Sequence, residues 1–317
     1  MEKLITIFGA TGTQGTSVIH HILNDPDLSK EFRIRGVTRD ISKPAAQKLL
    51  NHNIELLTAD LNNPLTIPPT LQDTHTIFLA TDYWTHQSPT KEFQQAKHVI
   101  DAATAAGVKH VVFSSLDSTI LHTDGRYRNV GHREGKARAE EYLQASGMKW
   151  TAVLVGYYMN NFLGLAERMN GERKEGEGIR EEGFLLRYPF DGDRRILPLV
   201  DAEKDVGLFV GTILKDLDVF AGRRVLVADR YYSACEIMET FSRVTGKKWV
   251  FCQVTPEEFR ALAPDGCGLE YMETHLMIDE YGYFMAGEEG LNESKELVKG
   301  ETSSLGEYLE RVSGYWD

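Results

Sequence analysis

Three glycines spaced three residues apart lie near the start of the chain, in the run Phe8-Gly9-Ala10-Thr11-Gly12-Thr13-Gln14-Gly15. An apolar strand pattern at 4–8 precedes them, and a helical pattern comes after them. Glycine permits a tight turn at the first position, close backbone approach to a pyrophosphate at the second, and close helix–strand packing at the third. The free N–H groups at the helix start attract phosphate. The spacing therefore predicts a dinucleotide site, and an ordinary glycine-rich turn is the alternative.

The charges after the second predicted strand, at 33–38, indicate which dinucleotide is bound. A carboxylate in this place would accept hydrogen bonds from the adenine ribose and repel a 2′-phosphate. The chain instead has Thr38 and Arg39, with Lys43 close by. The Arg39 guanidinium can bind phosphate through a fork of donors, and Lys43 adds positive charge. Asp40 would instead favour NAD(H), unless its side chain points away from the site. The alternative interpretation is that Arg39 and Lys43 are solvated surface charges. We expect NADP(H).

Polar residues also come after the third and fourth predicted strands, at 54–58 and 76–80, where ligands of open α/β sheets bind. These residues are Asp60 with its neighbour Leu61, and then Thr81, Asp82 and Tyr83. Asp60 can accept from the adenine amino group, although a turn cap explains it equally well. Gln94 and Lys97 on the next helix are expected to reach the same region, or to form a solvated face.

Strand and helix patterns alternate through the first half of the chain. Further strands are predicted at 111–114 and 150–155, and helices at 44–50, 90–106 and 134–145. Pro44 suits a first helical turn, and Gly107 suits a helix end. Apolar strands separated by helices indicate a parallel sheet covered on both faces. The prediction is a doubly wound α/β domain of the Rossmann type over residues 1–156.

The pattern changes in the second half. Residues 171–183 are charged and rich in glycine, which predicts a mobile surface loop. A strand is expected at 224–227, and the chain after it is predicted to be mainly helical. We expect a smaller, helix-rich domain over residues 157–317, with the segment 196–230 returning to the large sheet.

Composition limits the classes of function. The 317 residues carry a net charge of −12, with no basic run, so direct nucleic-acid binding is disfavoured. Cys235, Cys252 and Cys267 have no metal-ligand or disulfide spacing, and no metal site is predicted. Without a secretory pattern or an apolar run of about 18 residues, we expect a cytoplasmic protein, possible in the nucleus as well. A protein partner, a small-molecule substrate and a homodimer all stay open.

Several motifs together resemble the NmrA-like family of atypical short-chain dehydrogenases/reductases. They are residues 8–15, Thr38-Arg39, Thr81-Asp82-Tyr83-Trp84, His132-Arg133-Glu134-Gly135-Lys136 and Tyr157-Tyr158-Met159-Asn160-Asn161-Phe162. The likeness covers essentially the whole chain. It implies a large Rossmann domain, a small C-terminal domain and NADP(H) in the cleft between them. It also implies that Arg39 contacts the phosphate and that Tyr158, Met159, Asn160 and Asn161 line the cofactor.

Reductases of this superfamily use Tyr-x-x-x-Lys, in which the Tyr protonates the product alkoxide. The Lys binds the nicotinamide ribose and lowers the pKa of the Tyr. Here Lys136 is present, and His132 replaces the tyrosine. Lys136 is therefore expected to bind the ribose. His132 is a candidate proton donor, or a helix-start histidine without chemistry, and Tyr158 is a second candidate donor.

These residues are compatible with two functions. An intact cofactor site with an incomplete catalytic pair favours a cofactor-responsive redox sensor or regulator, whose bound state changes its partner surface. The likeness to NADPH-sensing members of the family places this function first. The alternative is an NADPH-dependent reductase of a small carbonyl, enone or imine, for which the altered catalytic pair puts ordinary carbonyl reduction in doubt.

Overall fold

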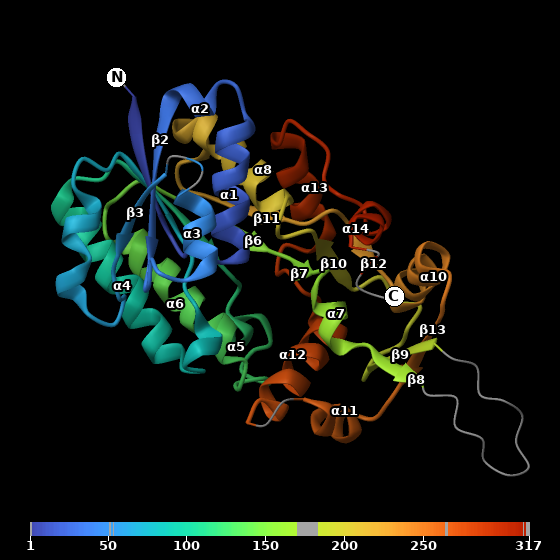
Figure 1. Ribbon diagram of the computed structural model, residues 1–317. Coiled ribbons are helices and arrows are strands. Elements are labelled where there is room, and N and C mark those ends of the chain that lie inside the picture. The colour runs from blue at the N-terminus through green and yellow to red at the C-terminus, as the bar shows by residue number, and fades with distance from the viewer. Residues whose placement is uncertain are drawn as a thin grey trace, which may run out of the picture.

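A seven-stranded sheet forms the centre of the larger part of the molecule (Figure 1). The computed structural model describes residues 2–50, 52, 54–169, 183–263, 266–312 and 314, so the loop predicted at 171–183 lies outside it except for Gly183. The strand order is β11-β6-β5-β4-β1-β2-β3, and every pairing is parallel. The strands are β1 Lys3–Phe8, β2 Phe32–Thr38, β3 Glu55–Thr58, β4 Thr76–Leu79, β5 His110–Ser115, β6 Trp150–Val155 and β11 Arg223–Val227.

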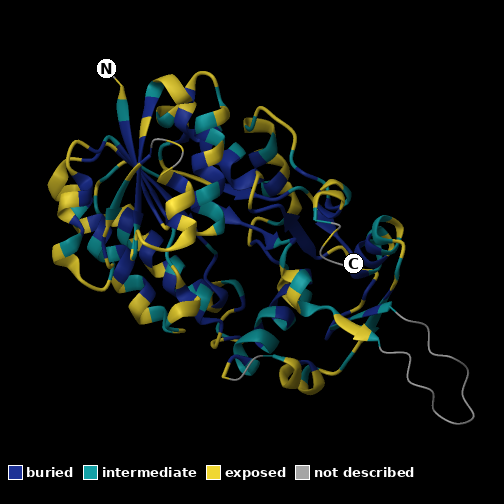
Figure 2. Cartoon of the chain, in the orientation of Figure 1, coloured by how far each residue is buried: buried dark blue, intermediate teal, exposed yellow. Residues whose placement is uncertain are grey.

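Helices cover both faces of this sheet. One apolar cluster joins Ile5 and Ile7 to buried residues of α1, α3 and α8, and another joins Phe8 to α4 and α6. The alternation arises because successive strand side chains point to opposite faces. Figure 2 shows the strands buried between helices with exposed outer faces. The helices are α1 Thr13–Asn24, α2 Leu28–Glu31, α3 Pro44–Leu50, α4 Pro89–Ala106, α5 Thr119–His122, α6 Gly131–Ala145 and α8 Asp205–Lys215.

The doubly wound fold predicted from the sequence is confirmed, and the element boundaries agree closely. The helix expected at 90–106 begins at Pro89 after the Ser88 cap, and it ends at Gly107, which adopts a left-handed φ of 70°. The helix expected at 134–145 begins earlier, at Gly131. Because glycine is a poor helix former, the sequence pattern did not indicate a helical turn that begins at Gly131. A side chain at Gly131 would overlap the Tyr83 hydroxyl, which explains why glycine is suited to this place.

The C-terminal part is richer in strands than the sequence indicated. It contains the two three-stranded sheets β12-β10-β7 and β13-β9-β8. Their strands are β7 Tyr157–Tyr158, β8 Glu167–Met169, β9 Gly183–Tyr188, β10 Leu197–Val200, β12 Tyr231–Tyr232 and β13 Lys248–Gln253. The helices of this part are α7 Asn161–Leu165, α9 Leu217–Phe220, α10 Ala234–Thr245, α11 Pro256–Leu262, α12 Gly268–Tyr281, α13 Gly287–Leu297 and α14 Leu305–Arg311.

The segment 196–230 divides between the two parts. β11 joins the edge of the large sheet beside β6, and α8 packs against α1. β10 instead pairs with β7 and β12. Within the described residues, no helix is both long enough and apolar enough to span a bilayer.

Candidate functional site

A pocket of about 410 Å³ lies at the carboxyl ends of β1, β2, β3 and β4. Many of the predicted cofactor residues meet there, although they come from five separate segments of the chain. Those lining it are Gly9, Thr11, Gly12, Thr13, Gln14, Gly15, Thr38, Arg39, Asp60, Leu61, Thr81, Asp82 and Tyr158. Parallel strands end at the same edge of a sheet, so the residues after different strands become neighbours.

The glycine turn has the geometry of a phosphate cradle. Gly9 adopts a left-handed φ of 77°, and a side chain at Gly15 would overlap the Gly9 carbonyl oxygen. A Cβ at Gly12 would instead meet only that oxygen, at 3.4 Å, which is ordinary contact. The fold therefore requires glycine at 9 and 15, whereas Gly12 leaves room on the pocket side.

Backbone donors face the same space. Gly12 precedes α1, and the first bond of that helix runs from Thr16 N to Gly12 O at 2.9 Å. The N–H groups of residues 13–15 therefore come before the helical ladder, where a helix presents donors and the positive end of its dipole. Gln14 Oε1 is buried, and no hydrogen-bond partner for it is found among the described residues.

Arg39 is available to an anionic ligand. Its Nη2 donates to Asp82 Oδ2 at 3.3 Å, and the two side chains are 58% and 54% exposed, so the pair is weak. The Asp40 carboxylate turns to Ser42, accepting from its Oγ at 2.6 Å and its N at 2.8 Å. These bonds lower the pKa of Asp40, so it stays ionised, but its side chain is held by Ser42 and does not line the pocket. Lys43 is exposed just before α3 and does not line the pocket.

Residues that follow β3, together with Gln95 of α4, form another wall of the pocket. Asp60 lines the pocket, and its carboxylate also accepts from Asn62 N and Nδ2, at 3.0 and 2.9 Å, as a turn cap. Gln95 lines the pocket and donates to Asn62 Oδ1 at 3.1 Å. Of the two interpretations of Gln94 and Lys97, the structure shows the solvated face, because Gln95, one residue or about 100° further round the helix, is the residue that lines the pocket. Gln94 is exposed, and Lys97 pairs with Asp101.

Lys136 belongs to a buried polar network beside the pocket. Its Nζ donates to Thr81 Oγ1 at 2.9 Å and lies 3.2 Å from Glu92 Oε1. Thr81 Oγ1 donates to the same Glu92 oxygen at 2.7 Å. Lys136 is thus one hydrogen bond from Thr81, which lines the pocket. Its expected role at the nicotinamide ribose stays a prediction.

Tyr158 lines the pocket beside the glycine turn. Gln14 Nε2 donates to its hydroxyl at 2.6 Å, and burial raises the pKa of Tyr158 to about 12, so the phenol stays protonated. Of the three residues after it, Met159 is fully buried and Asn161 is exposed. Asn160 Oδ1 is buried, without a hydrogen-bond partner in the described part of the chain. None of these three lines the pocket.

His132 does not face the pocket; it holds the two parts of the molecule together. Its N and Nδ1 bond to Glu270 Oε1 of α12 at 2.9 and 2.7 Å. Tyr83 Oη donates to Glu270 Oε2 at 2.8 Å, and Trp84 stacks on the imidazole with centroids 5.4 Å apart. Burial acts to raise the pKa of Glu270, but the bonds from His132 outweigh it and lower that pKa. Glu270 is therefore a carboxylate with three donors.

The model of the NmrA-like family matches residues 1–309. This chain belongs to the NmrA-like family. Its NmrA-like relatives include the domain-containing oxidoreductases PtmS of Penicillium ochrochloron and LnaB of Aspergillus flavus. Each is 31% identical over 265 residues, covering 80% of this chain and 77% of the relative. The resemblance drawn from the sequence motifs is confirmed.

Solved structures extend the comparison across the whole NmrA-like chain. A crystal structure of NmrA, a negative transcriptional regulator, is 25% identical with a TM-score of 0.81, covering 99% of this chain and 96% of NmrA. NmrA has also been crystallised with NAD, in a structure that is 25% identical with a TM-score of 0.80 and the same coverage. Another NmrA structure contains NADP. These relatives hold the class of cofactor that the sequence predicted here.

Three polar residues of this NmrA-like site were missed by the sequence reading. From the sequence alone, Glu92 is an ordinary acidic residue in the first turn of a helix. Gln95 is likewise indistinguishable from a solvated residue of the same helix. Glu270 lies 138 residues from His132, with no local pattern that links them. Glu92 and Gln95 are both buried on one face of α4, three residues apart, but no local pattern distinguishes either of them from a solvated helix residue.

Proposed function

We propose that this NmrA-like protein binds NADP(H) and acts as a cofactor-responsive regulator. The observation that carries the proposal is the bond between Tyr83 and Glu270. Residues 81 and 82 line the pocket, and the next residue along the chain is hydrogen-bonded to α12. A ligand that moves this segment acts directly on the junction between the two parts of the molecule.

The residues at the pocket suit a dinucleotide with an extra phosphate. The amides of residues 13–15 and the open side of Gly12 suit a pyrophosphate. Arg39 suits the 2′-phosphate, because its guanidinium is exposed and held only by a weak pair. Lys136, held beside the pocket by Thr81 and Glu92, is the group expected to bind the nicotinamide ribose. The cofactor, when bound, supplies a hydride for reduction.

Regulation requires that the cofactor favour one of two arrangements. Glu270 provides the means, because it receives donors from His132 on α6 and from Tyr83 after β4. The residue in the position of the catalytic tyrosine is thereby used as a structural link. A displacement at Thr81 or Asp82 changes the bond that holds α12.

Reduction is the second candidate, and one observation favours it. Tyr158 presents a protonated hydroxyl at the pocket, held by Gln14, so a proton donor other than His132 is available there. The oxidoreductase names of the fungal relatives also support this candidate. NADPH oxidation at 340 nm against carbonyls, enones and imines tests it, with Tyr158→Phe expected to abolish turnover.

Hydrogen exchange along α12 tests the regulator. We expect saturating NADPH to change exchange in α12 of the wild type, and the change to vanish in Glu270→Gln. Glu280→Gln is the matched control, because Glu280 is on the same helix and pairs with Arg126 rather than with His132 or Tyr83. Identical exchange and identical particle size with and without NADPH would refute the proposal. NADPH affinity, measured in the same samples, shows that the pocket is intact.

A further inference from the structure

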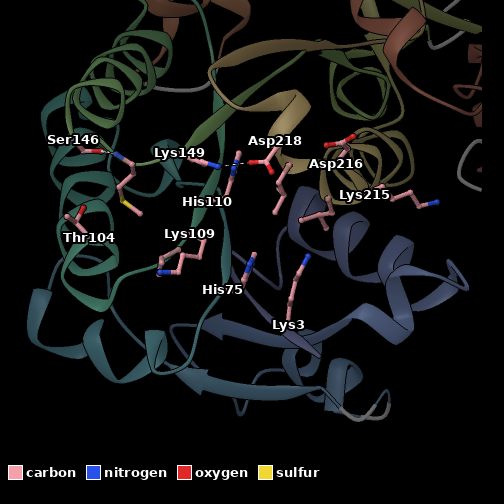
Figure 3. Close-up of a pocket in the computed structure, with 15 residues that line it drawn as sticks. Lys3, His75, Thr104, Lys109, His110, Ser146, Lys149, Lys215, Asp216 and Asp218 are labelled. Carbon is pink, nitrogen blue, oxygen red and sulfur yellow. Dashed lines mark hydrogen bonds and ion pairs between the residues drawn. The ribbon is translucent and has the colours of Figure 1, made fainter. Parts of the chain in front are cut away.

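A second pocket, of about 680 Å³, lies at the opposite ends of the parallel strands from the cofactor pocket, where β1, β4, β5 and β6 begin. Figure 3 shows basic side chains from these neighbouring strand ends and from the end of α8 surrounding it. They are Lys3, His75, Lys109, His110, Lys149 and Lys215. Such a gathering of basic groups is unexpected in a chain whose net charge is −12.

Four lysines line this basic pocket together with Asp216 and Asp218. Lys3 and Lys215 are already paired, with Glu31 and Asp25, each at 2.6 Å. Burial and then Lys3 and Lys109 lower the pKa of His75, while burial and then Lys149 lower the pKa of His110 to about 4. Both imidazoles are therefore neutral. Lys149 pairs with Asp218 at 2.6 Å, but these side chains are 61% and 82% exposed. In the part of the chain that the structure describes, Lys109 has no acidic partner within 4.0 Å.

His110 presents an unused acceptor in the same place. Its side chain is 1% exposed, lines the pocket, and is bonded through Nε2 to Thr151 Oγ1 at 2.9 Å. The single proton of Thr151 goes to Phe220 O at 2.8 Å, so Nε2 of the neutral ring must be the donor. Nδ1 is then an acceptor, and no described residue donates to it. A buried acceptor without a donor is costly, and a ligand hydroxyl would satisfy it.

We propose that the basic pocket binds a small phosphate monoester that carries free hydroxyl groups. Lysine ammonium groups bind phosphate as point charges, and Lys109 and Lys149 supply two of them. The incoming phosphate competes with Asp218 for Lys149, and the exposed Asp218 side chain can leave without disturbing the core. A ligand hydroxyl then donates to His110 Nδ1 once the side chains that cover this atom have moved, because solvent does not reach it in the structure. A volume of this size is in the range of small-ligand sites.

Calorimetry with glucose 6-phosphate on the full chain tests this site. The protein is kept saturated with NADPH, so that the probe cannot occupy the cofactor pocket. We expect saturable binding that Lys109→Glu weakens about tenfold or more and that Asp218→Asn strengthens. Lys299→Glu, an exposed change of the same charge in the C-terminal part, should leave the affinity unchanged. The ¹⁵N resonance of His110 Nδ1 should move with glucose 6-phosphate and stay fixed with inorganic phosphate.

Absence of binding at millimolar probe, or an affinity that Lys109→Glu leaves unchanged, would overturn the proposal. Equal affinity for inorganic phosphate, together with a fixed His110 resonance, would overturn the hydroxyl contact. Thermal unfolding of each variant is measured first, so that a loss of binding is assigned only to folded protein. These outcomes do not depend on whether the cofactor regulates the protein, because NADPH is present at the same saturating concentration throughout.

Discussion

The Glu92 carboxylate and the Lys136 ammonium form a buried ion pair, with Oε1 and Nζ 3.2 Å apart and Glu92 wholly inaccessible to solvent. Gly135, next to Lys136, is required by this contact, because a side chain there would lie 2.5 Å from Glu92 Oε2. The ammonium therefore approaches the cofactor pocket from a fixed position. Such rigid placement suits a group that holds a ribose.

Removing the carboxylate should leave a buried charge without its partner. We expect Glu92→Gln to lower the free energy of unfolding by about 3–5 kcal/mol, the usual cost of breaking a buried pair. The Glu92→Gln/Lys136→Met double variant should lose less than the two single variants combined. Urea unfolding measures the cycle, and strictly additive losses would show that the two groups are not coupled.

Arg39 should determine the preference between the two cofactors. We expect Arg39→Ala to weaken NADPH binding by roughly tenfold to a hundredfold, because a charge-assisted bond to phosphate is lost, and to leave NADH binding nearly unchanged. Lys43→Ala is the matched control, since Lys43 lies outside the pocket lining. Calorimetry with both nucleotides gives the answer. Equal affinity for NADPH and NADH in the wild type would contradict the assignment.

Two glycines of the same turn should behave in opposite ways. Gly15→Ala places a methyl group against the Gly9 carbonyl, so we expect it to destabilise the apo protein by about 1–3 kcal/mol through overpacking. Gly12→Ala has room and should leave apo stability nearly unchanged while weakening NADPH binding. Thermal unfolding without nucleotide, followed by calorimetry, separates the effects. Wild-type NADPH affinity in Gly12→Ala would argue against a phosphate at this turn.

Asp205 should make stability depend on pH. Burial raises the pKa of Asp205 from 3.8 to about 7, although Ser303 donates to its carboxylate. Because the folded state holds the proton more tightly, this group's stabilisation is complete below pH 3.8 and is lost as the pH rises through about 7. Between pH 4.5 and 7.5 the wild type should therefore lose about 3 kcal/mol relative to Asp205→Asn.

Denaturant unfolding of both proteins across this pH range measures that difference. Taking the difference cancels the titration of the other carboxylates, which act in the same way in the two proteins. A stability difference that does not vary with pH would mean that Asp205 titrates normally.

Much of the cofactor site was predictable because its signals are local. Gly9, Gly12 and Gly15 act through backbone conformation within seven residues, and apolar periodicity marks the adjoining strand and helix. Arg39 was predictable from its place directly after a strand. The parallel arrangement then brings the strand ends together without further information. Gln95 was missed because a small error in helical phase exchanges an exposed residue for a buried one.

The sequence by itself determined the doubly wound fold, the glycine turn and the arginine that follows the second strand, since each depends on residues close together in the chain. Only the tertiary structure decided that His132 bonds to Glu270, that Glu92 is a buried partner of Lys136, and that lysines gather where the strands begin. The physical reason is that burial and charge pairing depend on which distant element covers a side chain. The local hydrophobic periodicity of the sequence does not contain this information.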